Sequence, residues 1–121
     1  MVPKSPKAAA GLFSYYAIRY YAGRNIVTDP SFLVLASLAD GEKHGYAIME
    51  DIHAFAGVRL GPGTLYGAIA RLEARGWIRP LPSQDRRQPY QLTAQGKRYL
   101  EEQLAGMDAV VRTAMRRLKH A

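Results

Sequence analysis

Apolar side chains between residues 30 and 76 recur every three to four positions, which predicts three short helices. The first is expected from Pro30 to about Ala39, because Asp29 can accept hydrogen bonds from free backbone N–H groups and proline loses nothing at the first helical position. This helix is apolar on most sides, so it should lie at the centre of the fold. The second helix is expected from near His44-Gly45 to about Ala56, and the third from Pro62 to Gly76. The second should bury Ala47, Ile48, Ile52 and Phe55 and expose Glu50, Asp51 and His53, and the third should bury Leu65, Ile69 and Leu72.

Alternating side chains after the third helix predict a two-stranded hairpin. Residues 77–81 are expected as a short edge strand, since they contain Pro80, and residues 90–92 as the returning strand. Between them lies a turn-rich tip that carries Arg86 and Arg87. The hairpin should therefore present a positive tip.

A final helix is expected from Ala94 to about Leu118, with Thr93 as its N-cap. Its apolar residues follow a 3.5-residue repeat, and a seam that narrow packs against another helix. The partner is either the first helix with the N-terminal arm or the same helix of a second copy, and we expect a homodimer. The residues expected on this dimerisation seam are Leu100, Leu104, Met107, Val111, Ala114 and Leu118.

Residues 1–29 form an N-terminal arm, in which a further helix is expected over Ala8 to Ala22. Two aromatic doublets, Tyr15-Tyr16 and Tyr20-Tyr21, cannot share one narrow face. We expect this helix to pack on its own or a partner subunit, and an interfacial membrane helix is the alternative. The apolar run near its start lacks a clear small-residue cleavage site, which argues against a secretion signal. No window approaches 18 consecutive apolar residues, so we expect no membrane-spanning helix.

The charge of the chain indicates a polyanionic partner. Seventeen lysine and arginine residues stand against 10 acidic residues, which gives a net charge of +7 and a pI of about 9.9. Such a balance is typical of proteins that bind nucleic acid or anionic lipid. Eight basic and two acidic residues fall within 57–98, so this segment should meet the polyanion.

The composition also excludes several classes of chemistry. The absence of cysteine rules out disulfides, thiolate-bound metals and a cysteine nucleophile, and it fits a cytoplasmic location. The three histidines, His44, His53 and His120, are too scattered to form a metal site. We find no nucleophile elbow, phosphate loop or supported carboxylate pair. We therefore expect no enzyme, no metal and no cofactor.

The order helix, helix, helix, hairpin, helix is that of a winged helix-turn-helix. The fold class expected is mainly α with a small β-hairpin, extended by an N-terminal helix and a long C-terminal dimerisation helix. The expected divisions are the arm at 1–29, the DNA-binding domain at 30–93 and the dimerisation helix at 94–121. In such a fold the third helix enters the major groove, and an arginine-bearing wing reaches the minor groove or backbone. The residues expected to contact double-stranded DNA are Gly63, Thr64, Tyr66, Gly67, Arg71, Arg86, Arg87 and Gln88.

Several residues in this region also have structural interpretations. Thr64 and Tyr66 could serve in helix packing or capping, and Arg86 and Arg87 could lie in a solvated turn without contacting DNA. Arg71 could brace the fold through Glu73 or Glu50 instead of contacting DNA. Trp77 is expected in the core at the junction of the third helix and the wing, and His44 is expected to act as a structural residue at the start of the second helix.

Several short motifs resemble the PadR-like transcriptional regulators over about residues 30–100. The resemblance implies a dimeric winged-helix repressor of the small subclass, with a single C-terminal dimerisation helix, that a small hydrophobic or aromatic effector releases from DNA. The chain departs from the family pattern at Gly61, Gly67 and Ala94, where the family has serine, proline and an acidic residue, so its operator preference should differ. The matching motifs are His44-Gly45-Tyr46-Ala47-Ile48, Gly61-Pro62-Gly63-Thr64-Leu65-Tyr66, Arg71-Leu72-Glu73, Gly76-Trp77-Ile78, and Arg87 to Thr93 followed by Gly96.

Two other classes of function stay open on the sequence. The winged helix could be a protein-interaction adaptor whose long helix and aromatic arm recruit a different protein. The arm, from Leu12 to Tyr21, could instead lie on a lipid surface.

Overall fold

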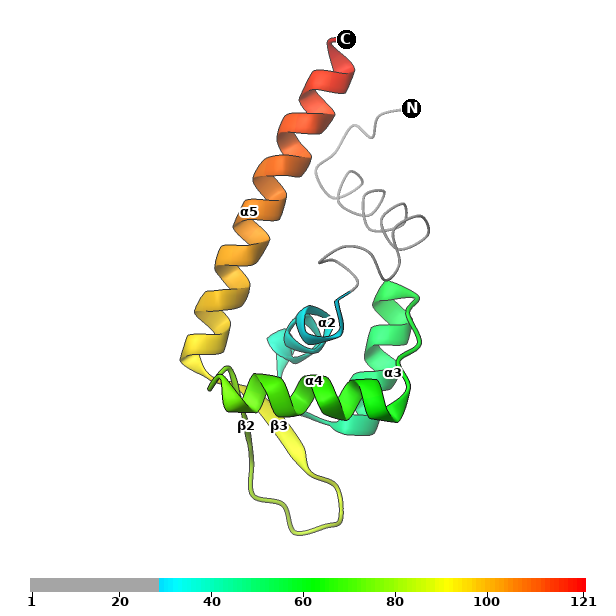
Figure 1. The fold of residues 1–121 in the computed structure, drawn as a ribbon, viewed down its shortest axis with the longest axis vertical. Helices are drawn as coiled ribbons and strands as arrows, with labels where there is room; N and C mark the ends of the chain where they lie inside the picture. The colour runs from blue at the N-terminus through cyan, green and yellow to red at the C-terminus, as the bar shows by residue number, and fades with distance from the viewer. Residues whose placement is uncertain (1–28) are drawn as a thin grey trace.

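The computed structural model describes residues 29–121, which form a helical body, a hairpin wing and a long C-terminal helix (Figure 1). The helix expected over residues 8–22 lies outside the described residues. The fold is mainly helical with a small antiparallel sheet, as the sequence predicts. In chain order the elements are α2 (Pro30–Ser37), the 3-10 turn η2 (Leu38–Asp40), β1 (Lys43–His44), α3 (Gly45–Ala56), α4 (Pro62–Ala74), β2 (Ile78–Pro80), β3 (Pro89–Leu92) and α5 (Ala94–Lys119).

Helix α2 lies at the centre of the body, which confirms the expectation from its composition. The Asp29 side chain caps it by accepting a hydrogen bond from the backbone N–H of Phe32 at 3.2 Å. Phe32 and the three residues after it are at most 8% exposed. The α-helix ends at Ser37, slightly earlier than expected, and one 3-10 turn carries the chain to Gly41. Gly41 has a φ of +149°, a conformation that favours glycine.

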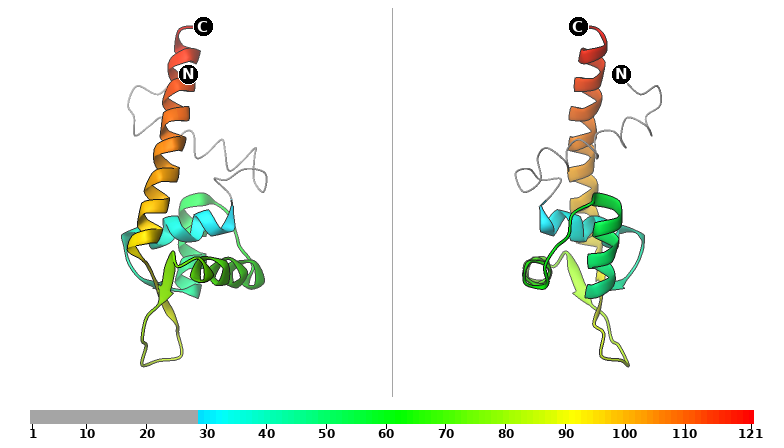
Figure 2. Two further views of the ribbon diagram at one scale, coloured as in Figure 1. Left: turned by 60° about the vertical axis from the view of Figure 1, so that its left-hand side comes forward. Right: turned by 90° about the vertical axis from the view of Figure 1, so that its right-hand side faces the viewer.

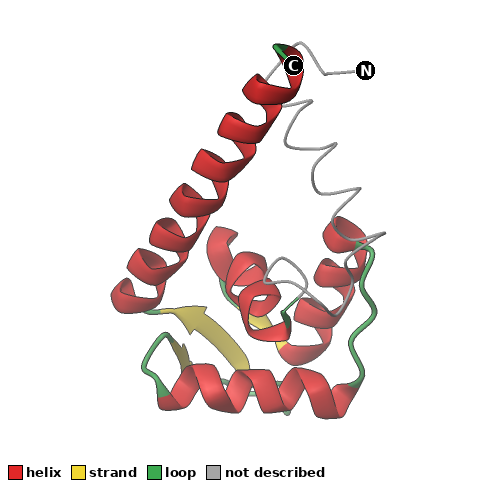
Figure 3. Ribbon diagram, turned by 45° about the horizontal axis from the view of Figure 1, so that its top comes forward, coloured by secondary structure: helices red, strands yellow, loops and turns green. Residues whose placement is uncertain are grey.

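Helices α3 and α4 pack their apolar stripes around α2 (Figure 3). Phe55 is an exception to the expected pattern, because its side chain is 48% exposed. The buried residues of α3 are Gly45, Ile48, Ile52 and Ala56, which leaves Phe55 at the edge of the stripe and Ala47 half-buried. The stripe expected for α4 is confirmed and also includes Ala68. The residues of these two helices that are at most 2% exposed are Ile48, Ile52, Leu65, Ala68, Ile69 and Leu72.

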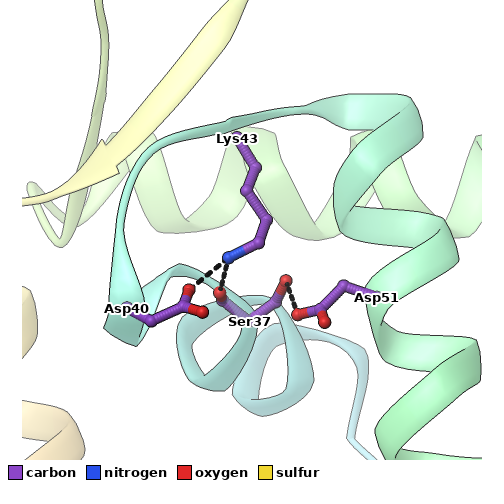
Figure 4. Close-up of polar contacts among 4 residues, drawn as sticks. All are labelled: Ser37, Asp40, Lys43 and Asp51. Carbon is purple, nitrogen blue, oxygen red and sulfur yellow. Dashed lines mark hydrogen bonds and ion pairs between the residues drawn. The ribbon is translucent and has the colours of Figure 1, made fainter.

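A polar network holds the turn between α2 and β1 in place (Figure 4). The Ser37 side chain is 2% exposed and donates a hydrogen bond to Oδ2 of Asp51 at 2.7 Å. The expectation that Asp51 faces solvent is therefore wrong, because a buried hydroxyl needs an acceptor. Lys43 donates to the Ser37 carbonyl at 2.5 Å and pairs with Asp40. The hydrogen bond from Lys43 and its charge lower the pKa of the Asp40 carboxyl.

The sheet has three antiparallel strands in the order β1-β3-β2. The hairpin formed by β2 and β3 is the one that the sequence predicts, with Arg79 opposite Gln91. Strand β1 was not expected, because two residues are too few to show alternation. It pairs His44 with Pro89 and so ties the start of α3 to the base of the wing.

Helix α5 begins in the body and then leaves it (Figures 1 and 2). Thr93 caps it by accepting a hydrogen bond from the backbone N–H of Gly96 at 3.0 Å, as expected. Leu100 is 4% exposed, and Tyr99 and Met107 are half-buried against the core. Within residues 29–121, no helix combines the length and apolar character that crossing a membrane requires.

Candidate nucleic-acid interface

Helix α4 lies at the end of the molecule opposite to the C-terminus of α5, and the wing projects beyond it (Figures 1 and 2). Its N-cap residue is Gly61, which has no side chain to cap the helix. Within the described residues, the backbone N–H groups of Gly63 and Thr64 have no hydrogen-bond partner. Both residues are exposed. The first turn of α4 therefore presents free donors to an anion.

The side chain of Tyr66 lies between α4 and the start of α3. It is 51% exposed, and its hydroxyl packs against the backbone of Gly45. A Cβ on Gly45 would lie 2.4 Å from the Tyr66 hydroxyl oxygen, which is closer than atoms can approach. The glycine of the His44-Gly45 motif thus makes room for the ring, and the ring remains open to solvent on its outer side.

Arg71 lies two turns beyond Thr64 on α4. It is exposed, and its Nη1 would lie 3.5 Å from a Cβ added at the half-buried Gly67, so the side chain runs back along the helix. Within residues 29–121 Arg71 forms no ion pair, and neither Glu73 nor Glu50 braces it. Its guanidinium is therefore available on the surface of α4.

The wing tip is a compact turn built around Asp85. Its Oδ1 accepts hydrogen bonds from the backbone N–H of Arg87 at 2.7 Å and from the Ser83 hydroxyl at 3.2 Å. The bond from the Arg87 backbone is the main cause of the lowered pKa of Asp85. The side chains of Arg86 and Arg87 are exposed. The turn thus holds the backbone of Arg87 in place, while its guanidinium reaches back toward His44 at the base of the wing.

Gln88, the remaining wing residue expected to contact DNA, is exposed but also stabilises the wing through hydrogen bonds. Its amide Nε2 donates to the carbonyl of Leu81 at 2.8 Å and to that of Pro89 at 2.9 Å. These bonds join the two sides of the hairpin where the strands end. The Gln88 amide nitrogen is therefore engaged within the wing.

A sequence profile of the transcriptional regulator PadR-like family matches residues 34–102, which include the core of the body, α4, the wing and the start of α5. The chain belongs to this family. Members of the PadR-like family are transcriptional regulators, in agreement with the expectation that the chain is not an enzyme.

Solved structures of transcriptional regulators share the fold. A PadR family transcription regulator from hypervirulent Clostridium difficile R20291 is 26% identical, with 74% of this chain and 96% of that chain covered and a TM-score of 0.64. A transcriptional regulator from Clostridium thermocellum is also 26% identical, with 70% and 85% covered and a TM-score of 0.62. Bacillus subtilis PadR in complex with operator DNA is 24% identical, with 61% and 45% covered and a TM-score of 0.54, and it supports the fold alone.

One curated relative is more similar in sequence but much longer. It is an uncharacterized 37.1 kDa protein in transposon TN4556 of Streptomyces fradiae, and it is 51% identical over 79 residues. The match covers 65% of this chain and 23% of that protein. The chain therefore spans less than a quarter of the length of this relative.

In this PadR-like chain, Trp77 lies at the joint between α4 and the wing, as the sequence predicts, but it is half-buried and also packs against α5. Its ring stacks on Tyr99 of α5 with 3.8 Å between the ring centroids, and the Arg75 guanidinium lies 5.1 Å from its centroid. The Trp77 backbone also touches α5, since a Cβ on Gly96 would lie 1.9 Å from the Trp77 carbonyl oxygen. Thr93 adds a hydrogen bond to the Gly76 carbonyl at 2.6 Å. The joint is therefore tightly packed.

A recess of about 210 Å³ opens beside this joint. Its lining combines polar, basic and aromatic side chains. The residues that line it are Asp29, Ser31, Phe32, Leu35, Arg71, Leu72, Arg75, Trp77 and Tyr99.

The six seam residues expected on α5 do not share one environment. Leu100 is buried in the core of its own body, whereas Leu104 is 46% exposed and Leu118 is 68% exposed. Met107 and Val111 are half-buried and Ala114 is exposed. Val110, which the 3.5-residue repeat does not include, is 69% exposed and adds to the apolar surface. Within residues 29–121, the exposed part of the seam thus lies beyond Leu100 and includes Leu104, Ala114 and Leu118.

Proposed function

We propose that this PadR-like regulator binds double-stranded DNA as a homodimer and represses transcription, with α4 in the major groove and the wing on the adjacent minor groove or backbone. The observation that carries the proposal is the exposure of the first turns of α4 and of the arginine-bearing wing at the same end of the molecule (Figure 2). Residues 30–93 serve as the DNA-binding domain and residues 94–121 as the dimerisation helix. The site of action is the cytoplasm.

The electrostatics of this end support DNA binding. In residues 29–121 the ion pairs are Lys43 with Asp40 and Arg112 with Asp108, and neither includes an arginine of α4 or of the wing. Unneutralised guanidinium groups bind phosphate and release condensed counterions from DNA. Bacillus subtilis PadR, a member of the same family, has been solved in complex with operator DNA. The DNA-contact residues that we propose are Gly63, Thr64, Tyr66, Gly67, Arg71, Arg86, Arg87 and Gln88.

The exposed side of α5 supports a homodimer. The helix runs 26 residues, and within the described residues its apolar side chains Leu104, Val110 and Leu118 are exposed. Pairing with a second copy would bury them, because a 3.5-residue repeat packs against another helix. In the dimer the two α4 helices should lie about 34–36 Å apart, so that they enter successive major grooves.

The recess beside Trp77 supports regulation by a small hydrophobic or aromatic effector. A 150 Å³ cavity holds a benzene-sized ring, and this recess of about 210 Å³ has room for a substituted ring. Its walls belong to both α4 and α5, so a ligand there would change the angle between the DNA-binding end and the dimerisation helix. Such a change would move the two α4 helices out of register with DNA and release it.

Selection of bound DNA from a random pool, followed by titration of the selected duplex, tests the proposal. The expected result is an operator with two-fold symmetry that binds at least a thousandfold more tightly than mixed-sequence DNA. Sedimentation at the same concentrations should give a dimer. An absence of binding to any duplex at about 50 mM salt would contradict DNA binding and favour an adaptor that recruits another protein.

A further inference from the structure

Two nitrogen atoms from segments far apart in the sequence meet at the base of the wing. Nη1 of Arg87 lies 3.5 Å from Nε2 of His44. His44 is the N-cap of α3, and its Nδ1 accepts a hydrogen bond from the backbone N–H of Ala47 at 3.3 Å. A neutral imidazole whose Nδ1 accepts carries its proton on Nε2. The two groups that face each other are therefore both hydrogen-bond donors.

Two donors cannot hydrogen-bond to each other, but a single acceptor placed between them can accept from both. Within the described residues, neither Nε2 of His44 nor Nη1 of Arg87 has an acceptor partner. Asp85 is the acidic group nearby; its Oδ1 accepts from the Arg87 backbone and the Ser83 hydroxyl, and within the described residues its carboxylate forms no hydrogen bond or ion pair with either side-chain donor. The contact is exposed, so an oxygen from outside the chain can reach both donors.

The supporting structure fixes both donors. The cap bond to Ala47 sets the orientation of the His44 ring, and the pairing of β1 with β3 places His44 opposite Pro89, two residues after Arg87. The backbone N–H of Arg87 is held by Asp85. The Tyr66 ring of α4 packs against Gly45, the residue after His44. The donor pair therefore lies where α3, α4 and the wing meet.

We propose that His44 and Arg87 together hold one backbone phosphate of duplex DNA, with Nε2 of His44 and the Arg87 guanidinium donating to its oxygens. The proposal rests on the DNA binding proposed above and adds His44, a residue that the sequence indicates only as structural. A phosphate oxygen has lone pairs and negative charge, so it can accept hydrogen bonds from both donors. The contact positions the protein on DNA and reads no base.

The test compares variants that keep the cap of α3 but remove the imidazole donor. Serine and asparagine are both good N-cap residues, so H44S and H44N should fold and melt like the wild type. Each should weaken binding about tenfold on every duplex sequence, since a hydrogen bond to a charged group is lost. H53S is the matched control, because His53 on the same helix also touches an arginine, with Nε2 3.3 Å from Nη2 of Arg59. H53S should bind DNA like the wild type.

Methylphosphonate substitution identifies the phosphate. Each backbone phosphate of the selected duplex is replaced in turn by a neutral methylphosphonate, and the affinities of wild type, H44S and R87A are measured. The expected result is one position in each half-site at which the methylphosphonate weakens binding by the wild type. At that position it should change the affinity of H44S and R87A very little, because these variants have already lost the contact. The double variant H44S/R87A should lose clearly less than the product of the two single losses, because both side chains hold the same group.

Three results would overturn the proposal while leaving DNA binding intact. H44S and H44N could bind like the wild type, H44S and R87A could map to different phosphates, or the two losses could multiply fully in the double variant. If both His44 variants unfold at a lower temperature than the wild type, the ¹⁵N chemical shift of His44 Nε2 in the wild-type protein tests the contact instead. It should move on binding the unmodified duplex and not on binding the duplex with the methylphosphonate at the mapped position. A wild type that binds no duplex would contradict the proposed function itself.

Discussion

The two ends of this molecule are both exposed, but they differ in chemistry. At the α4 end the free groups are backbone N–H donors, a tyrosine ring and guanidinium groups outside any ion pair. Toward the far end of α5 they are apolar side chains, with Val110 and Leu118 both more than two-thirds exposed, beside the basic residues Arg116, Arg117 and Lys119 of the last turn. Exposed donors are satisfied by water and need no partner to fold, whereas an apolar seam gains free energy only when it is covered. The comparison supports the proposal that one end binds a polyanion and the other self-associates.

The packing around Trp77 connects the two ends rigidly. Trp77 touches α5 through its ring, which stacks on Tyr99, and through its carbonyl, which lies against Gly96. Because both contacts are close, the orientation of α5 fixes the orientation of α4 and of the wing. Association at one end can therefore set the spacing of the two DNA-binding surfaces at the other.

The largest effect is expected from charges placed on the apolar end. L118D combined with V110D should prevent dimerisation, because each aspartate would have to be buried against the second copy. Binding to a two-fold symmetric operator should weaken about a hundredfold or more as the effective concentration of the second half-site is lost. Sedimentation equilibrium and DNA titration measure the two effects. R112D is the control, since Arg112 is an exposed neighbour on the same helix, and it should leave the dimer intact. An unchanged dimer in the double variant would show that α5 is not the interface.

The next effect concerns the joint. G96A should lower the free energy of unfolding by about 1–3 kcal/mol, because the added Cβ overlaps the Trp77 carbonyl oxygen and backbone must move. G106A is a matched control in the same helix, with nothing within 4 Å of its added Cβ, and it should raise that free energy by about 0.5–1 kcal/mol through helix propensity. Urea unfolding of the two variants checks both signs. Equal effects of the two substitutions would mean that the contact between Trp77 and α5 is loose.

A smaller effect is expected where α3 meets α4. G45A puts a Cβ into the space of the Tyr66 hydroxyl, which is the far end of a side chain that can rotate. The cost in stability should therefore stay below about 1.5 kcal/mol, while the affinity for DNA falls because Tyr66 leaves its position. In the Y66A background the same substitution should have almost no effect on stability or on DNA binding. If G45A lowered stability and DNA affinity as much in the Y66A background as in the wild type, overlap with Tyr66 would not be the cause.

At the wing, removal of one charge should act uniformly on all DNA sequences. R86A should reduce the steepness of log affinity against log salt by about one unit, as expected for one lost phosphate contact. R112A, which removes an arginine from the opposite end, should leave the slope unchanged. Titrations at four or more salt concentrations give the slopes. An unchanged slope for R86A would remove Arg86 from the contact surface.

The elements with strong local signals were predictable from the sequence. Asp29, Thr93 and Pro62 mark helix starts through side-chain or backbone chemistry that acts within one turn, and the structure shows helices starting directly after Asp29 and Thr93 and at Pro62. The wing strands follow from alternation and lie within a few residues of the expected positions. Local hydrogen bonding and side-chain periodicity account for these results.

The features that were missed depend on contacts between distant residues. Strand β1 is two residues long and exists because β3 lies beside it. Asp51 turns inward because Ser37, 14 residues earlier, is buried without another acceptor for its hydroxyl. The meeting of His44 and Arg87 joins positions 43 residues apart, and only the fold brings them together. The candidate DNA-contact residues could be named from the winged-helix order, but the donor pair required coordinates.

The smallest effect expected is a pH dependence confined to the wing tip. The pKa of Asp85 lies below its ordinary value, first because its carboxylate accepts a hydrogen bond from the Arg87 backbone. A lowered pKa in the folded state means that the bond is fully present above the ordinary aspartate pKa, near 3.9, and is lost as the pH falls through the lowered value. The amide proton of Arg87 should therefore shift in NMR spectra with a midpoint below about 3.9. D85N should abolish this titration, and at neutral pH it should leave the apolar end of α5 unchanged. A midpoint at or above the ordinary value would show that the turn does not hold Arg87 in place.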